Sequence, residues 1–482
     1  MLSFGASLYV HVYLSKIRKS VMSLIKSISG IRGTIGGREK DNLTPIDTVK
    51  FAAAYGTWLK QELQKDKITV VVGRDARISG EMIQNLTMNT LVGLGIDVID
   101  IGLSTTPTVE VAVPLEKADG GIILTASHNP KQWNALKLLN NKGEFLNAEA
   151  GAKILKIAEA ETLEFAEVDD LGKISVKENY IDLHIEEVLK LKMVAIDKVK
   201  NAGFKVVVDA VNSSGGIAIP ALLKKMGVEV VELYCEPNGH FPHNPEPLKE
   251  HLTDICNLVK KEKADLGIVV DPDVDRLAFI DETGEMFGEE YTLVACADYI
   301  LSKEKGNTVS NLSSSRALRD ITQKHHGNYK ASAVGEVNVV KLMKDTNAII
   351  GGEGNGGIIY PQAHYGRDSL VGTALFLTYL AEKGKKVSEI RKEYPSYFMS
   401  KNKIELTPDL DVDGILRAVE KRHSNQEIST VDGVKIDFPE NWVHLRKSNT
   451  EPIIRIYTEA KSQQEADELA QKMIKEIEDI IA

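Results

Sequence analysis

Short apolar runs rich in β-branched residues alternate along this chain with longer stretches of helical periodicity. The runs expected to form strands are residues 68–72, 121–124, 205–208, 266–270 and 348–350. Two expected helices begin at residues that favour a helix N-terminus, Thr44, which Pro45 follows, and Ser79. This alternation predicts parallel α/β units, with helices covering the sheets.

The chain is too long for one compact core, because 482 residues suffice for about three or four domains. From about residue 396 the pattern becomes strand, helix, strand, strand and a final amphipathic helix over residues 463–481, which predicts a smaller α+β domain. Residues 1–14 are apolar, but their basic cluster follows them, the wrong order for a secretory signal. We expect residues 1–21 to be an extension before Met22, with a short helix at a membrane surface as the alternative.

Composition argues against several classes of protein. The 59 basic and 69 acidic side chains give a net charge of −10, so there is no basic excess for a nucleic-acid backbone. No run of 18 apolar residues is present, so we expect no membrane partner. The three cysteines, Cys235, Cys256 and Cys296, form no CxxC pair and are odd in number, which favours a reducing, cytoplasmic location.

Three of the expected strands run directly into a short polar loop. The loops read TASHNP over residues 125–130, DPDVDR over residues 271–276 and GGEGNGG over residues 351–357. Ligands bind at the carboxyl ends of strands in open α/β sheets, so these loops are candidate ligand sites.

The loop at residues 271–276 is a candidate metal site. Asp271, Asp273 and Asp275 alternate, which places three carboxylates on one side of an extended backbone. Three like charges so close repel one another unless a cation lies among them, and hard oxygen ligands suit Mg²⁺. The alternative is a solvated acidic turn in which Arg276 balances the charge.

The loop at residues 125–130 presents Ser127, His128 and Asn129 just beyond a buried strand. An ordinary turn that hydrogen-bonds its own backbone is the alternative interpretation. Ser127 lacks the GxSxG pattern of a hydrolase, so phosphoryl transfer beside a divalent cation is the better hypothesis.

Two further loops carry groups suited to polar ligands. Residues 351–357 combine five glycines with Glu353 and Asn355, natural partners for sugar hydroxyls, although a plain glycine-rich turn is an equal alternative. The segment RKSNTEP at residues 446–452 has the groups for binding a phosphate dianion, although solvated surface is the alternative. These groups are Arg446, Ser448, Asn449, Thr450 and the nearby Arg455.

Taken together and in this order, the four loops resemble those of the α-D-phosphohexomutase superfamily, which includes phosphoglucosamine mutase and phosphomannomutase/phosphoglucomutase. The similarity runs from SGIRG at residues 29–33 to the SNTEP segment. The resemblance implies an α/β fold of four domains around a central cleft, three related mixed α/β sandwich domains and a C-terminal α+β domain that grips phosphate. We expect the extension at residues 1–21 and domains at residues 22–170, 171–283, 284–395 and 396–482.

By resemblance, Ser127 is the phosphorylated serine and also a ligand of the Mg²⁺ ion that Asp271, Asp273 and Asp275 hold. Arg32, His128 and Lys137 match active-site positions, with Arg32 and Lys137 implied in proton transfer or charge stabilisation. The positions implied in substrate binding are Arg276, Glu353, Asn355, Arg446, Ser448, Asn449, Thr450 and Arg455.

Three departures from the family pattern concern the loops. Val274 and Ala135 stand where many members have glycine. Gly357 stands where many members keep a histidine, and we expect His364 to take that place.

The function implied is a mutase that interconverts hexose 6-phosphate and hexose 1-phosphate through phosphoserine 127 and a hexose 1,6-bisphosphate. Phosphoglucosamine mutase is the favoured assignment, and phosphomannomutase/phosphoglucomutase is the alternative. More distant alternatives are a serine-dependent metal phosphatase and a non-catalytic phosphosugar-binding protein. The expected partner is a phosphosugar, and the chain is expected to be a monomer or homodimer.

Overall fold

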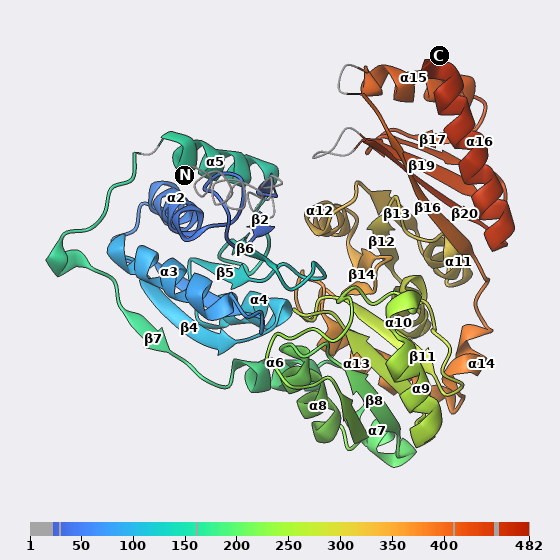
Figure 1. Ribbon diagram of the computed structural model, residues 1–482. Coiled ribbons are helices and arrows are strands. Elements are labelled where there is room, and N and C mark those ends of the chain that lie inside the picture. The colour runs from blue at the N-terminus through green and yellow to red at the C-terminus, as the bar shows by residue number, and fades with distance from the viewer. Residues whose placement is uncertain (1–22, 28–29, 161, 408–409, 448–452, 482) are drawn as a thin grey trace, which may run out of the picture.

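The computed structural model describes residues 23–27, 30–160, 162–407, 410–447 and 453–481. Their strands form four sheets, and we call each sheet with its covering helices a unit, numbered 1 to 4 in chain order. Figure 1 shows unit 1 on one side of the molecule, units 2 and 3 next to each other, and unit 4 above unit 3.

Unit 1 contains a seven-stranded sheet in the order β1-β2-β6-β5-β3-β4-β7. Strands β3, β4, β5 and β7 are parallel, while β6, β2 and β1 add as antiparallel strands at one side. The strands are β1 (Ile25–Ser27), β2 (Gly30–Thr34), β3 (Thr69–Arg74), β4 (Asp97–Leu103), β5 (Gly120–Leu124), β6 (Trp133–Leu139) and β7 (Ile174–Val176). The helices are α2 (Pro45–Leu63), α3 (Gly80–Gly93), α4 (Thr106–Leu115) and α5 (Ala148–Ala160). Strand β7 lies beyond residue 170, where the sequence suggested a domain boundary, yet it pairs with β4.

Units 2 and 3 each contain a four-stranded sheet, in the orders β11-β10-β8-β9 and β13-β12-β14-β15. Unit 2 comprises α6 (Tyr180–Leu189), α7 (Ile196–Ala202), β8 (Lys205–Asp209), α8 (Gly215–Lys225), β9 (Glu229–Leu233), α9 (Thr253–Glu262), β10 (Leu266–Val270) and β11 (Leu277–Asp281). Unit 3 comprises α10 (Glu289–Lys303), β12 (Asn307–Asn311), α11 (Ala317–Lys324), β13 (Tyr329–Ser332), α12 (Glu336–Thr346), β14 (Ala348–Glu353), β15 (Gly357–Ile359), α13 (Ser369–Lys383) and α14 (Val387–Arg391). One continuous hydrophobic core, from Ile181 on α6 to Tyr394, joins the two units.

Unit 4 contains an antiparallel five-stranded sheet in the order β16-β20-β19-β18-β17. Its elements are β16 (Phe398–Glu405), α15 (Val412–Arg422), β17 (Glu427–Ser429), β18 (Val434–Asp437), β19 (Trp442–Lys447), β20 (Ile453–Ala460) and α16 (Gln463–Ile481). The sequence predicted the final helix but only two strands between the helices, whereas the structure has four. The missed strands are short, and β17 is a partly exposed edge strand with little apolar patterning.

The local predictions for the other units are confirmed where they can be compared. All five expected strands form, as β3, β5, β8, β10 and β14. Thr44 caps α2 in a capping box with Asp47. Ser79 precedes α3, but its hydroxyl makes no cap and instead accepts a hydrogen bond from Asn134 Nδ2 at 2.9 Å.

Two absences can be stated for the described residues. All three cysteines fall among them, and none is in a disulfide. No helix in the described ranges is both long and apolar enough to cross a bilayer.

Candidate functional site

Each of units 1 to 3 contains an antiparallel hairpin at the edge of its parallel strands, β5–β6, β10–β11 or β14–β15. The loops of these hairpins contain residues 125–132, 271–276 and 354–356. The three polar loops that the sequence singled out are therefore structurally equivalent features of three related units.

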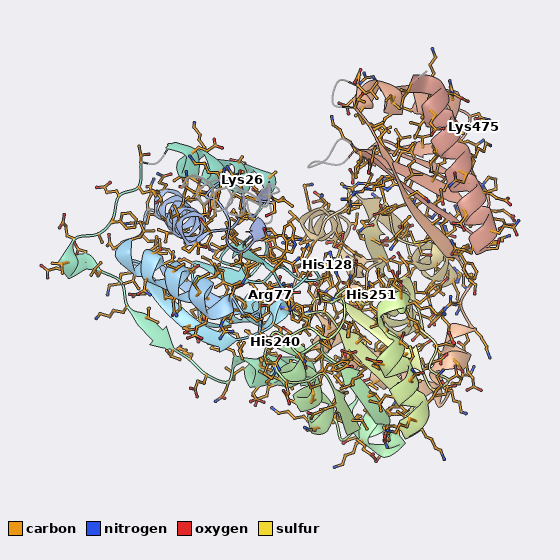
Figure 2. All side chains as sticks on the ribbon, viewed as in Figure 1. Lys26, Arg77, His128, His240, His251 and Lys475 are labelled. Atoms are coloured by element: carbon orange, nitrogen blue, oxygen red, sulfur yellow. The ribbon has the colours of Figure 1, made fainter. Side chains whose placement is uncertain are left out.

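The first two loops meet at Ser127. Its Oγ donates a hydrogen bond to Asp271 Oδ2 at 2.7 Å, and both side chains are buried. The predicted serine and the predicted acidic loop, 144 residues apart in the chain, are thus in direct contact. Figure 2 shows His128, the next residue, on the side of unit 1 that faces the other units.

Three buried carboxylates, Asp271, Asp273 and Asp275, converge beside this hydroxyl, and their oxygens approach within 4.8 Å of one another. Within the described structure, Asp273 Oδ1 and Asp275 Oδ1 are buried without a hydrogen-bond partner. Burial, together with the charges of Asp273 and Asp275, raises the pKa of Asp271 well above its usual value. Orphaned carboxylate oxygens in such a cluster fit a hard divalent cation.

Lys137 on β6 places its ammonium group against the same cluster. Its Nζ lies 2.7 Å from Asp273 Oδ2 and 3.4 Å from Asp275 Oδ2. Burial alone would lower the pKa of Lys137, but the two carboxylates outweigh burial, and the net pKa is raised. Lys137 therefore carries its proton in this arrangement and acts as a cation.

A cavity of about 450 Å³ opens beside Ser127. Arg32 on β2 lines it and donates to Asn129 Oδ1 at 2.8 Å. Burial lowers the pKa of His128 to about 2, and the positive charges of Arg276 and Arg32 add to this effect, so the imidazole is neutral near pH 7. The predicted residues that line this cavity are Arg32, Ser127, His128, Lys137, Arg276, Glu353 and Asn355.

Arg367, which no sequence motif singled out, connects the loop at residues 271–276, the candidate metal loop, to the loop at residues 351–357. Its guanidinium donates to Asp275 Oδ2 at 2.7 Å, Glu353 Oε2 at 2.8 Å and Glu336 Oε2 at 3.0 Å. Burial lowers the pKa of Arg367, but Asp275 and the two glutamates outweigh it, and the net pKa is raised well above the usual value. The planar guanidinium group of Arg367 thus binds all three buried carboxylates at once.

His364 does not take the place of the family histidine, so that expectation was wrong. The space beside Gly357 belongs to Arg367, whose Cδ would lie 2.2 Å from a Cβ added at position 357. His364 instead lies against Asp368 and Glu110, at 3.1 and 3.4 Å, and lines a different cavity. The segment after β15 turns its histidine away from Ser127 because Asp368, four residues further on, caps α13 and holds the ring.

The segment of unit 4 that the sequence predicts to bind phosphate is described only at its ends. Arg446 on β19 and Arg455 on β20 are opposite each other in register, and Arg446 Nε pairs with Asp432 Oδ2 at 2.7 Å. Neither arginine lines the cavity beside Ser127. The predicted Ser448, Asn449 and Thr450 lie outside the described residues.

Comparison with known families decides the identity. Four family descriptions match in order, the phosphoglucomutase/phosphomannomutase α/β/α domains I (residues 24–165), II (179–284) and III (288–397) and the C-terminal domain (400–476). The chain belongs to the phosphoglucomutase/phosphomannomutase family. It is therefore a member of the α-D-phosphohexomutase superfamily, with that superfamily's four-domain α/β fold, and it is a mutase.

Individual relatives agree with this assignment. The chain is 37% identical to a phosphoglucomutase/phosphomannomutase of Thermococcus kodakarensis, over 93% of this chain and 98% of that protein. It is 33% identical to a probable phosphoglucosamine mutase of Methanopyrus kandleri, over 92% and 96% of the two chains. Among solved structures it is similar to a family protein of Burkholderia thailandensis, with a TM-score of 0.81, 25% identity and coverage of 96% and 97%.

Sequence reasoning also missed the residues that hold the serine loop of this phosphohexomutase. Arg77 is 1% exposed and donates to the carbonyls of Ser127, Asn129, Pro130 and Trp133. It belongs to the polar loop after β3, which follows the same strand-to-loop pattern that identified the other three sites. This pattern could therefore have drawn attention to Arg77 from the sequence.

Thr106, at the start of α4, holds the metal loop from unit 1. Its backbone N–H donates to the Asp273 carbonyl at 2.8 Å, and its Oγ1 donates to Asp273 Oδ2 at 2.6 Å. No motif in the sequence links these two residues, because the contact exists only where two units meet.

Proposed function

We propose that this phosphohexomutase is a phosphoglucosamine mutase, which interconverts glucosamine 6-phosphate and glucosamine 1-phosphate through a phosphorylated Ser127 and a 1,6-bisphosphate intermediate. The observation that carries the mechanism is the 2.7 Å contact between Ser127 Oγ and the buried acidic cluster. The choice of sugar is supported by the Methanopyrus kandleri relative and by one from Sulfurisphaera tokodaii, named phosphoglucosamine/phosphogalactosamine mutase and 31% identical.

Ser127 exchanges the phosphoryl group with the sugar. In the first transfer, a bond forms between the free sugar hydroxyl oxygen and phosphorus while the bond from phosphorus to Ser127 Oγ breaks. The sugar hydroxyl loses its proton as the new bond forms, and Ser127 Oγ gains one as its bond to phosphorus breaks, so the transfer is proton-neutral overall. The bisphosphate then turns over, and the reverse step returns its other phosphate to Ser127. The buried position of Ser127 limits attack by water on the phosphoserine.

Asp271, Asp273 and Asp275, with Ser127, would hold Mg²⁺, and the two orphaned carboxylate oxygens fit this role. When bound, the ion supplies neutralisation of the charge on the phosphoryl oxygens. Lys137 and Arg32 contribute fixed positive charge beside the transferring group. Neutral His128 lies 3.4 Å from Ser127 Oγ and orients that oxygen.

The sugar is recognised from the opposite side of the cavity. Glu353 and Asn355 bind sugar hydroxyls, and the Glu353 carboxylate is held for this by Asn311, Gly335 and Arg367. Arg276 contributes to binding from the metal loop. The distal phosphate is bound by the segment from Arg446 to Arg455 with Ser448, Asn449 and Thr450 after unit 4 moves toward Ser127.

The domain bounds, cellular location, oligomeric state and partners are also part of the proposal. Domains at residues 22–170, 171–283, 284–395 and 396–482 would follow an extension at residues 1–21, with β7 at the start of the second range pairing back onto the sheet of the first. We infer a cytoplasmic enzyme that acts as a monomer or homodimer without nucleic acid or membrane partners.

The test follows ³¹P NMR signals of glucosamine 6-phosphate with Mg²⁺ and a trace of hexose 1,6-bisphosphate. Wild type is expected to form glucosamine 1-phosphate, and Ser127→Ala to lower kcat by at least about 10³-fold because the acceptor oxygen is removed. Ser104→Ala is the matched control, since Ser104 is also a buried serine of unit 1 but does not line the cavity. Full turnover by Ser127→Ala would exclude the mechanism.

The runner-up is a phosphomannomutase/phosphoglucomutase, which the name of the Thermococcus kodakarensis relative supports. Mannose 1-phosphate and glucose 1-phosphate are assayed beside the amino sugar under the same conditions. A higher kcat/KM for either neutral sugar would reassign the substrate while leaving Ser127 in place. Release of inorganic phosphate faster than isomer formation would indicate a phosphatase instead.

A further inference from the structure

A second group of metal-binding side chains meets where units 1, 2 and 3 touch. His184 lies on α6, Asp368 caps α13, and His364 lies in the segment between β15 and α13. The Nε2 atoms of His184 and His364 are 2.9 and 3.1 Å from Asp368 Oδ2. All three ligand atoms lie within 4.8 Å of one another. Ligand atoms around a tetrahedral zinc ion are about 3.3 Å apart, so the observed spacing is close to that of a zinc site.

Glu110 on α4 directs another buried carboxylate at this cluster. The side chain is 1% exposed, and its Oε2 lies 3.4 Å from His364 Nδ1. Neither carboxylate oxygen of Glu110 has a hydrogen-bond partner among the described residues. His364 Nδ1 is also buried without a partner in the described structure, so the two facing groups are unsatisfied together, and a proton between them would satisfy both.

The tautomers of the two imidazoles bear on this contact. Asp368 Oδ2 faces both Nε2 atoms, and a proton on each Nε2 satisfies it while leaving Nδ1 as an acceptor. This tautomer suits His184, whose Nδ1 can accept from Thr108 Oγ1 at 3.0 Å. The same tautomer of His364 leaves its Nδ1, which is buried without a hydrogen-bond partner in the described structure, with no proton to offer Glu110.

A metal ion bound to both Nε2 atoms would remove this conflict. Each imidazole would then carry its proton on Nδ1, so that His184 donates to Thr108 and His364 donates to Glu110. Metal-bound histidines typically donate their second N–H to a carboxylate, hydroxyl or carbonyl oxygen in this way. Asp368 is already oriented, because its Oδ1 accepts from the backbone N–H groups of Leu370 and Val371 and leaves Oδ2 for the ion.

We propose that His184, His364 and Asp368 bind one divalent transition-metal ion of the zinc type, with Thr108 and Glu110 orienting the two imidazoles. Two imidazoles and one carboxylate favour zinc over magnesium, which prefers an all-oxygen shell. A cavity of about 420 Å³ lined by His184 and His364 gives the ion a path from solvent and leaves a coordination position for water. The ion would tie α4, α6 and α13 together and so fasten three units.

The experiment starts from full-length protein freed of metal by a chelator. Zinc is added in the presence of millimolar Mg²⁺, which competes for the Asp271 cluster, and uptake is followed by isothermal titration calorimetry. One equivalent of zinc per chain is expected, together with a higher Tm. No uptake under these conditions would overturn the proposal.

Variants assign the ligands. His184→Gln and His364→Gln are each expected to lose the equivalent of zinc and the rise in Tm, and Glu110→Gln to weaken binding by about 10- to 100-fold. His325→Gln is the matched control, because His325 also pairs with a buried aspartate, at 2.6 Å from Asp298 Oδ1, but without a second histidine. Unchanged zinc affinity in both His184→Gln and His364→Gln would contradict the assignment.

A measurement on wild type keeps the proposal testable if these variants fail to fold. X-ray absorption of the zinc-loaded protein is expected to show two imidazole ligands with oxygen completing the shell. An all-oxygen shell would place the zinc in the aspartate cluster and would also overturn the proposal.

Discussion

Ser127 has a φ of 49°, in the left-handed region that non-glycine residues occupy at a cost of about 1–3 kcal/mol. Val274 in the metal loop has a φ of 65°, although its β-branched side chain disfavours this conformation even more. Both strained residues lie in loops of the site, and both are buried, so the surrounding structure holds them in place. For Ser127 much of that support comes from Arg77.

We expect Arg77→Lys to lower kcat by about 10²-fold while KM changes little, because an ammonium group cannot reproduce the planar fork that holds four carbonyls of the serine loop. Steady-state kinetics measure both constants. Arg38→Lys, at an exposed position of unit 1, is the control and should resemble wild type. A higher KM with an unchanged kcat would show that Arg77 does not position the nucleophile.

At the scale of elements, the repeated hairpins explain how three distant loops reach one cavity. Each hairpin begins at the carboxyl end of a buried strand, and the loops also contact one another across units. The backbone N–H of Leu277, at the end of the metal loop, donates to the Gly356 carbonyl at 3.1 Å. Gly356 has a φ of 86°, and a Cβ there would lie 2.3 Å from the Leu277 carbonyl oxygen, so this close approach requires glycine.

Helix α2 covers the strands that carry Arg32 and Lys137, and its N-terminus depends on Thr44. The Thr44→Ala variant loses the cap to Asp47, which is worth about 1 kcal/mol, so the Tm of the first unfolding transition should fall by about 2–4 °C. Differential scanning calorimetry measures the shift. Thr57→Ala in the same helix is the control, because the Thr57 hydroxyl has no hydrogen-bond partner in the described structure. Equal Tm values for both variants would contradict the role of the cap.

At the level of the whole molecule, units 2 and 3 share one core, whereas unit 4 has a separate core and makes polar contacts with unit 3. Arg316, which precedes α11, is central to that junction. Its guanidinium donates to the carbonyls of Pro439, Phe438 and Asn441 in unit 4. A polar junction of this kind suits a unit that moves relative to its neighbour.

Removing this junction should affect substrate binding, because unit 4 carries Arg446 and Arg455, which we propose to bind the distal phosphate. We expect Arg316→Ala to raise KM for the sugar phosphate by about tenfold, since three carbonyls lose their donor and the phosphate-binding segment is held less firmly. Arg319→Ala, in α11 itself and 31% exposed in its side chain, should change KM less than about twofold. Equal KM values for the two variants would show that Arg316 does not control the position of unit 4.

Local patterns in the sequence were sufficient to predict the alternation of strands and helices and the loops that carry chemistry. These patterns are apolar runs that end in TASHNP, DPDVDR and GGEGNGG, and they can be recognised without knowledge of the tertiary structure. The contacts between side chains became clear only from the fold. Arg367 bridges Asp275 to Glu353, and Thr106 holds Asp273, across units or between separate loops. His364 lies against Asp368 within its own segment instead of beside Ser127. These contacts depend on how the sheets and loops pack together, and that packing cannot be inferred from the spacing of residues along the chain.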